Sequence, residues 1–210
     1  MFPAGQAKVN RATHSNSPFA GLALSSLRRW AGIVFVLVLA IALTAPGYAA
    51  ENLQLIEQQI KAGLLYNFLK YTQWPAEHLR AGGPIQVCLF GGDPFDGRLQ
   101  PMAGRTVNEH VIEIKIIRAP TEIGDCSLLF VHASQAPNWP ELQKTLNGKS
   151  VLTVADFPDF AMAGGMIEFT RVANRIGVSI NTDAINAANL QVEDRLLRLA
   201  GNARAPAPGR

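Results

Sequence analysis

The sequence predicts an α/β protein: a single compact domain in which a mixed β-sheet is flanked by helices, with a closing antiparallel hairpin near the C-terminus. Three observations predict this fold. Helical segments alternate with short apolar runs that are typical of buried strands. Two further strand-like segments, at residues 166–170 and 176–180, are separated by a short connection, which favours an antiparallel pair. The 210 residues are 48% hydrophobic and 17% charged, a globular composition that excludes collagen-like, coiled-coil and disordered chains.

Residues 1–49 are predicted to be a secretory signal peptide with a long n-region. Residues 31–43 are wholly apolar, but this run is shorter than the roughly 20 residues that a transmembrane helix needs. Arg28 and Arg29 precede it, and small residues follow it, so we expect cleavage after Ala49. An uncleaved membrane anchor and twin-arginine export are the alternatives. The prediction is a soluble protein exported by the general secretory route, with the mature domain over residues 50–201.

The charge pattern argues against a nucleic-acid partner. The net charge is +3, but residues 1–49 contain four basic residues and no acidic one. The rest of the chain carries 15 Lys and Arg residues against 16 Asp and Glu residues. The basic excess therefore belongs to the leader and not to a binding face of the domain.

The first element of the mature chain is a predicted helix over residues 51–71. Its apolar residues recur every three or four positions, which indicates one amphipathic helix of about five turns. These residues are Leu53, Ile56, Ile60, Leu64, Phe68 and Tyr71. The helix ends before Trp74 and Pro75, because the residue before a proline is disfavoured in helical conformation. A polar loop over residues 76–84 follows.

Four strands and two helices are predicted next. Three strands, at residues 85–90, 126–131 and 151–155, are nearly continuous apolar runs and are expected to be buried on both faces. The fourth, at residues 111–117, alternates, which places its three even-numbered isoleucines on one face. A tight turn at residues 91–94 leads into a short helix with Asp93 as its N-cap. A second helix spans residues 139–146.

The C-terminal part closes the domain. After the hairpin, a helical turn is predicted at residues 185–189 and a last short helix at residues 194–200. Residues 202–210 contain mainly Pro, Ala, Gly and Arg and are predicted to be a disordered tail.

The two cysteines of the mature chain, Cys88 and Cys126, are far apart and match neither a metal-binding nor a redox motif. In an exported protein a disulfide is the leading interpretation, and two buried unpaired thiols are the alternative.

The reactive side chains form no catalytic or metal-binding pattern. His78, His110 and His132 have no histidine partner within four residues, and no G-x-S-x-G motif is present. The Gly91–Asp93 turn lacks the Lys and Ser/Thr of a phosphate-binding loop. The aspartates near the strand ends match no calcium-binding loop. We therefore expect no enzyme activity, cofactor or metal, and a binding or regulatory role.

Several sequence blocks, in this order and spacing, resemble the YfiR-like family of periplasmic regulatory proteins. The block Gly164–Phe169 is the strongest match. The others are residues 61–75, 85–91, 125–131, 148–156, 178–184 and 196–200. The resemblance covers residues 53–200, which is essentially the whole predicted domain.

The resemblance implies a function in cyclic di-GMP signalling and biofilm formation. The best-known members bind the periplasmic sensor domain of an inner-membrane diguanylate cyclase and hold it inactive. For this chain the resemblance implies such a cyclase, or a related sensor kinase, as partner, together with a homodimer and a disulfide between Cys88 and Cys126. The alternative is a periplasmic small-molecule-binding protein that serves a transport or sensory system.

Candidate contact residues lie at both ends of the domain. Exposed apolar residues of the first helix, with Tyr71, Trp74 and Pro75 at its end, are candidate partner contacts, and the alternative is that they all pack internally. Gln191 and Glu193, before the last helix, are candidate ligand contacts. The chain lacks the second cysteine pair of the best-known branch around residues 160–169, and the acidic and amide residues before the last helix argue against an anionic ligand there.

Overall fold

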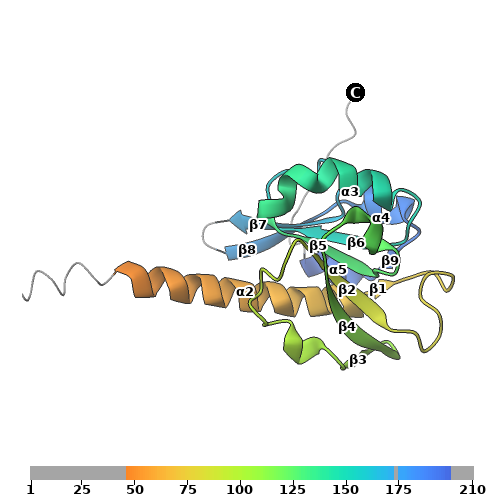
Figure 1. The fold of residues 1–210 in the computed structure, drawn as a ribbon, viewed down its shortest axis with the longest axis horizontal. Helices are drawn as coiled ribbons and strands as arrows, with labels where there is room; N and C mark the ends of the chain where they lie inside the picture. Colours follow the sequence, from red (N-terminus) through yellow and green to blue (C-terminus); the bar gives the residue numbers. More distant parts are fainter. Residues whose placement is uncertain (1–45, 173–174, 200–210) are drawn as a thin grey trace, which may run out of the picture. The chain divides into compact units, whose positions relative to one another are not determined.

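The computed structural model describes residues 46–172 and 175–199. The predicted tail and the predicted signal peptide, apart from residues 46–49, lie outside this part of the chain. Residues from Asn52 onward form one compact unit. This unit is an α/β domain with helices on both faces of a mixed sheet, as predicted (Figure 1).

The main sheet has seven strands in the order β3-β4-β2-β5-β6-β7-β8. Strands β4, β2, β5, β6 and β7 run parallel to one another, and the outer strands β3 and β8 are antiparallel to their neighbours. Their bounds are β2 Ile85–Phe90, β3 Thr106–Val107, β4 His110–Ile117, β5 Leu128–Val131, β6 Leu152–Ala155, β7 Ile167–Val172 and β8 Arg175–Ile180. The predicted hairpin is therefore confirmed as β7–β8.

Helices cover both faces of the sheet. Helix α2 (Pro46–Lys70) packs on one face with its C-terminal half, and α3 (Trp139–Leu146) packs on the other (Figure 1). Two short helices close the C-terminal part, α4 (Thr182–Ala187) and α5 (Asp194–Leu199). Short 3-10 helices occupy Gln100–Met102, Pro120–Ile123 and Ala133–Asn138.

The expected single buried face of α2 is wrong for the first half of the helix. The buried residues Ala62, Leu65, Phe68 and Leu69 all lie in the second half. Leu53, Ile56 and Ile60 are instead 69%, 54% and 47% exposed. Among the α2 residues whose side chains the structure describes, those in the core cluster on this side of the sheet begin at Ala62.

The short helix predicted after Asp93 is also wrong, because the segment folds as successive turns. Asp93 does cap them: its carboxylate accepts hydrogen bonds from the backbone N–H groups of Phe95 and Gly97, both at 2.8 Å. Asp96 and Gly97, however, have φ angles of 50° and 75°. Such left-handed residues are incompatible with a continuing right-handed helix.

Strand β4 departs from its predicted alternation at its C-terminal end. Ile112 is buried and Ile114 half-buried, but Ile116 is 45% exposed. Its neighbour Ile117 points to the other face and joins the core beneath α3. The face covered by α2 is thus open at the end of this strand.

A separate two-stranded pair joins distant segments. Strand β1 (Thr72–Gln73) follows α2 and pairs antiparallel with β9 (Gln191–Val192), which precedes α5. This pair ties the beginning of the domain to its end.

Candidate functional site

The two cysteines form the disulfide Cys88–Cys126. Cys88 lies in β2 and Cys126 just before β5, with their Cα atoms 5.8 Å apart. Both residues are buried beneath α3, in the same cluster as Trp139 and Phe160. The bond therefore joins neighbouring strands inside the core, where it stabilises the sheet and is shielded from exchange with other thiols.

The β1–β9 pair brings the predicted partner and ligand contacts together. Gln73 pairs with Gln191, and the Glu193 N–H donates to the Tyr71 carbonyl at 2.9 Å. Gln191 and Glu193 are exposed, whereas Tyr71, Trp74 and Pro75 are half-buried. Their proposed contacts with a partner or ligand remain predictions.

Trp74 has an internal role in this region. Its indole Nε1 donates to the Ser127 carbonyl at 3.0 Å, and its ring packs against the core beneath α2. Beside it lies a small cavity of about 190 Å³, whose lining includes Thr72 and His110. Trp74 thus anchors the chain that leaves α2, with only part of its surface open to a partner.

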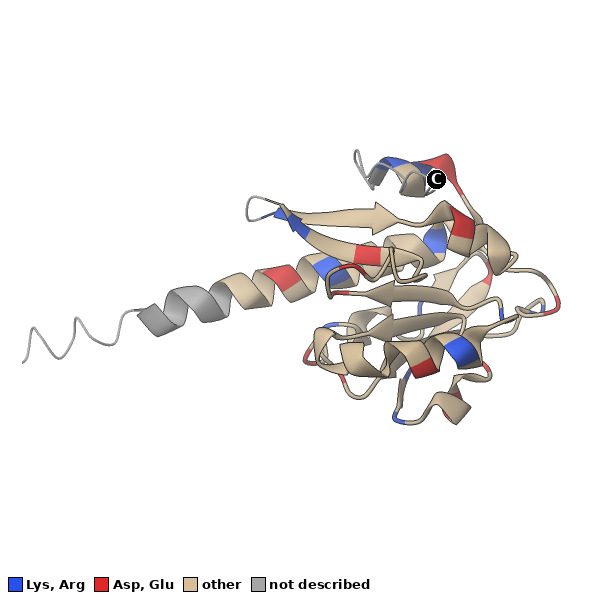
Figure 2. Ribbon diagram, turned by 90° about the horizontal axis from the view of Figure 1, so that it is seen from above, with Lys and Arg blue, Asp and Glu red and all other residues tan. Residues whose placement is uncertain are grey.

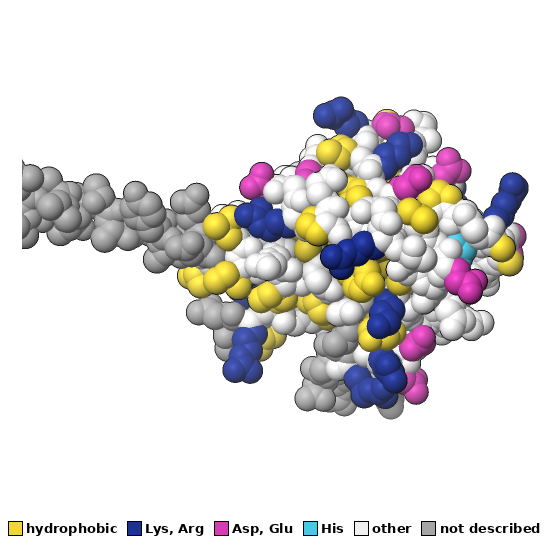
Figure 3. Space-filling view, turned by 90° about the horizontal axis from the view of Figure 1, so that it is seen from below, with side chains coloured by type: hydrophobic (Ala, Val, Ile, Leu, Met, Phe, Trp, Pro, Cys, Tyr) yellow, Lys and Arg dark blue, Asp and Glu magenta, His cyan; other side chains and the backbone are white. Residues whose placement is uncertain are grey.

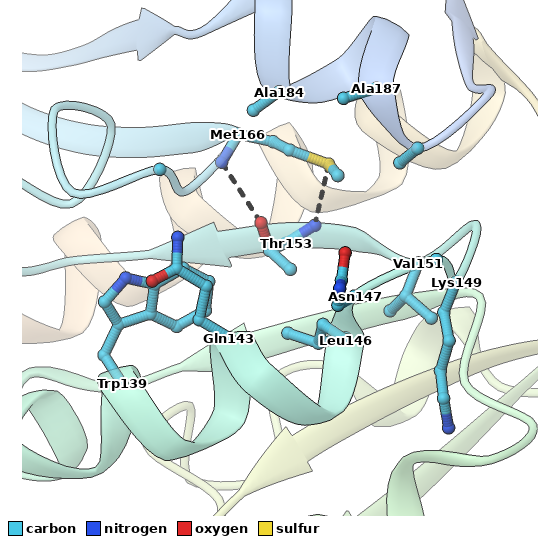
Figure 4. Close-up of a pocket in the computed structure, with 13 residues that line it drawn as sticks. Trp139, Gln143, Leu146, Asn147, Lys149, Val151, Thr153, Met166, Ala184 and Ala187 are labelled. Atoms are coloured by element: carbon cyan, nitrogen blue, oxygen red, sulfur yellow. Dashed lines mark hydrogen bonds between the residues drawn. The ribbon is translucent and has the colours of Figure 1, made fainter.

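A pocket of about 210 Å³ lies between α3, α4 and the start of β6 (Figure 4). Its polar groups bond to one another. The Met166 N–H donates to Thr153 Oγ1 at 3.1 Å, and the Thr153 N–H lies 3.5 Å from Met166 Sδ. Trp139 Nε1 and Gln143 Nε2 both donate to the Ala163 carbonyl, each at 3.1 Å. These four groups therefore serve packing at this junction, while Asn147 and Lys149 also line the pocket.

Two glycines explain why the chain has its Gly164–Phe169 block at this junction. A Cβ atom on Gly165 would overlap the Phe160 ring, and one on Gly164 would overlap the Gln143 side chain. Gly164 also has a φ of 87°, which side chains disfavour. Gly165 is thus required by packing, and Gly164 by its backbone conformation.

Charged side chains from distant segments meet at the carboxyl end of the parallel strands. Lys61 Nζ lies 2.9 Å from both Glu57 Oε1 and Asp156 Oδ2. Arg171, at the end of β7, pairs with Glu57. Asp156, directly after β6, also accepts the Ala133 N–H at 2.7 Å. Figure 2 shows charges of both signs on α2 and the neighbouring hairpin. We call these residues, Glu57, Lys61, Asp156 and Arg171, the ion-pair cluster.

A crevice of about 300 Å³ adjoins the ion-pair cluster. It lies over the ends of β2 and β5 and beneath the first half of α2. It is lined by Gln54, Gln58, residues 90–94, His132 and Ser134. We call it the switch-point crevice. Strand β4 lies on one side of β2 and the next strand of the parallel set, β5, lies on the other, so the strand order reverses between β2 and β5.

Sequence reasoning missed both features. The contact between Lys61 and Asp156 joins residues 95 positions apart, which no local pattern reveals. Gln54 and Gln58 lie outside the apolar positions from which the helix was predicted. The sequence signal that could have pointed to this region is Asp156, a charged residue directly after a buried strand.

Two groups outside the crevice have shifted pKa values. Burial lowers the pKa of His78, which lies near the backbone of Cys126 and borders an open groove of about 550 Å³. The backbone N–H groups of Arg118 and Ala119 lower the pKa of Glu122 by bonding to its carboxylate. Within the described segments, no three His, Cys, Asp or Glu side chains are grouped as metal ligands would be.

Comparison with known proteins decides the family. The model of the YfiR/HmsC-like family matches residues 58–201, which include the second half of α2, the whole sheet and α5. The chain belongs to the YfiR/HmsC-like family. No curated protein matches the chain.

YfiR/HmsC-like proteins are periplasmic and are regulatory rather than catalytic. The family supports a role in the regulation of diguanylate cyclases. Among the helices that the structure describes, none is long and apolar enough to cross a bilayer. The YfiR/HmsC-like match begins at Gln58, so Leu53 and Ile56 precede it on α2.

Proposed function

We propose that this chain is a periplasmic repressor that binds the sensor domain of an inner-membrane diguanylate cyclase, or of a related sensor kinase, and thereby controls cyclic di-GMP levels and biofilm formation. The family match over residues 58–201 carries this proposal. Repression would act by population shift: the protein stabilises the inactive arrangement of the sensor to the extent that it binds that arrangement more tightly.

The partner surface that we propose is the outer side of α2. Leu53, Ile56 and Ile60 are spaced three and four residues apart, so they share one face of the helix. We call these three residues the α2 apolar stripe. Figure 3 shows apolar side chains exposed on this side of the domain. A row of large exposed apolar residues on one helix face is the pattern by which helices dock against a partner.

Tyr71, Trp74 and Pro75 extend this proposed surface at the C-terminal end of α2. Gln191 and Glu193 lie beside them through the β1–β9 pair, and we keep these two as proposed ligand contacts. Because Trp74 is already hydrogen-bonded to Ser127, we expect the α2 apolar stripe to contribute more binding energy than the Trp74 end.

Charge substitutions on the stripe test the partner surface. We expect Ile56→Glu and Ile60→Glu to raise cyclic di-GMP in the host toward the level of a deletion strain, with no loss of melting temperature, because both side chains are already exposed. Gln59→Glu is the matched control, since Gln59 is exposed on the same helix outside the stripe. If the folded isoleucine variants repress as well as the wild type, α2 is not the partner surface.

We also propose that the protein is a homodimer. Light scattering of the purified protein measures this directly, and a monomeric mass across the concentration range of the assay would contradict it. The alternative function, a small-molecule-binding protein of a transport or sensory system, predicts a tightly bound ligand and no effect of deletion on cyclic di-GMP.

A further inference from the structure

The switch-point crevice occupies the position at which open α/β sheets bind ligands. In such sheets, ligands bind outside the carboxyl ends of the parallel strands, at the point where the strand order reverses. Here β2 pairs on one side with β4 and on the other with β5, both in parallel. The crevice is formed by the loops that follow β2 and β5. Its volume of about 300 Å³ is at the lower end of the range for small-molecule sites, roughly 300–1,000 Å³.

Helix α2 places polar side chains over the crevice where apolar ones would be expected. Gln54 and Gln58 are one turn apart and both line the crevice. Two turns further along the same face, Leu65 is fully buried in the core. In its first half the helix thus carries the exposed Gln54 and the half-buried Gln58 on the crevice side, and the α2 apolar stripe on the solvent side. Polar residues on the inner side of a helix are consistent with a site that is filled by a polar molecule.

The loops supply further hydrogen-bonding groups. His132 Nδ1 accepts the Ser134 N–H at 3.3 Å and lies 3.0 Å from Ser134 Oγ. In the neutral imidazole this bond assigns the proton to Nε2, which lies 3.9 Å from Asp156 Oδ2, so His132 can donate toward that carboxylate or to a ligand beside it. The two carboxamides and the Ser134 hydroxyl can each both donate and accept. The lining therefore suits a ligand whose groups also do both, such as a hydroxyl or an amide.

The charges around the crevice are balanced internally. Both oxygens of Asp93 accept backbone N–H groups, from Phe95 and Gly97. In the adjoining ion-pair cluster, the cations of Lys61 and Arg171 face the carboxylates of Glu57 and Asp156. The lining itself contains no Lys or Arg, and its one carboxylate, Asp93, is already hydrogen-bonded, so it offers no free charge to pair with a charged ligand.

We propose that the switch-point crevice binds a small neutral polyhydroxylated molecule, of the class of a single saccharide unit. Gln54 and Gln58 would contact it from α2, and His132 and Ser134 from the loop after β5. This ligand site is independent of the proposed repressor function, and either proposal can fail without the other. Because the site includes α2, a bound ligand would also fix the helix that carries the α2 apolar stripe.

Calorimetric titration of the purified protein with four sugars tests the ligand class. Glucose and N-acetylglucosamine are the neutral probes, glucosamine is the cationic probe and glucuronate is the anionic probe. We expect binding of at least one neutral sugar and none of the charged ones. At about ten times its Kd, the bound sugar should raise the melting temperature by roughly 3–6 °C. Absence of binding by both neutral sugars, or equal binding of a charged one, overturns the proposal.

Variants then locate the site. We expect Gln58→Leu and Ser134→Ala to weaken binding of that neutral sugar at least tenfold. Gln59→Leu is the matched control, because Gln59 is the adjacent exposed glutamine and does not line the crevice. Circular dichroism checks that all three variants are folded. Unchanged affinity in both crevice variants would place the sugar elsewhere and contradict the proposed site.

Discussion

Lys61 Nζ lies 2.9 Å from Asp156 Oδ2, and this ion pair joins α2 to the end of β6. Only 12% of the Lys61 side chain and 8% of the Asp156 side chain are exposed. The same ammonium also contacts Glu57 and lies 5.8 Å from the centre of the Phe169 ring. Lys61 therefore fixes α2 to the sheet between the first half of the helix, whose apolar residues are exposed, and the second half, whose apolar residues are buried.

Lys61→Met should destabilise the protein by about 3 kcal/mol, because it leaves the Asp156 carboxylate buried without a cation. Urea unfolding measures this loss. Lys70→Met is the control, since Lys70 is exposed near the end of the same helix, and it should change stability by less than about 0.5 kcal/mol. Equal losses for the two variants would show that the ion pair has no special role.

The elements that the sequence predicted best are those with a strong local signal. Helix α3 has the predicted bounds, and β2 matches the apolar run at residues 85–90. The prediction failed where the local structure is determined by an unusual backbone conformation or by contacts with distant segments. The left-handed φ at Asp96 stops the predicted helix. Strands β1 and β9 have only two residues each, too few for a periodic signal.

The outward direction of the α2 apolar stripe could not be predicted either. Leu53, Ile56 and Ile60 have the spacing of a buried face, and only the position of the sheet shows that they lie outside the core. The switch-point crevice depends on the same fact, since Gln54 and Gln58 lie on the inner side.

Loss of the Cys88–Cys126 disulfide should cost about 3–4 kcal/mol in the chain-entropy model, because the bond closes a loop of 38 residues in the unfolded chain. Urea unfolding with and without a reductant measures the difference. The double variant Cys88→Ala, Cys126→Ala provides the control, which should be less stable than the wild type and insensitive to reductant. A wild-type midpoint that does not change on verified reduction would contradict this prediction.

Gly165→Ala should destabilise the protein by roughly 1–3 kcal/mol, because the added methyl group overlaps the Phe160 ring in a packed core. Gly63→Ala should have the opposite effect, a gain of about 0.5–1 kcal/mol, since Gly63 is an exposed helical position with open space around its Cα atom. Thermal unfolding of both variants checks the signs. A neutral Gly165→Ala would mean that packing against the Phe160 ring does not require a glycine at this position.

His78 should make stability fall as the pH decreases. Burial lowers its pKa in the folded state below the usual 6.5, so the unfolded chain binds a proton more readily than the folded one. Above pH 6.5 His78 is neutral in both states and does not reduce the free energy of unfolding. As the pH falls from 6.5 toward the lower folded-state pKa, this free energy decreases progressively. His78→Gln should therefore flatten the decline of the melting temperature over this interval. Parallel pH profiles for the variant and the wild type would contradict it.

The most direct test of the proposed repressor function is capture of the tagged protein from crosslinked envelopes of its own host, combined with deletion of its gene. We predict recovery of a transmembrane protein with a cytoplasmic diguanylate cyclase or kinase domain. Ile56→Glu should reduce this recovery, Gln59→Glu should not, and deletion should raise the output of the captured enzyme. Recovery of only transport components, or an unchanged output after deletion, would contradict the repressor function.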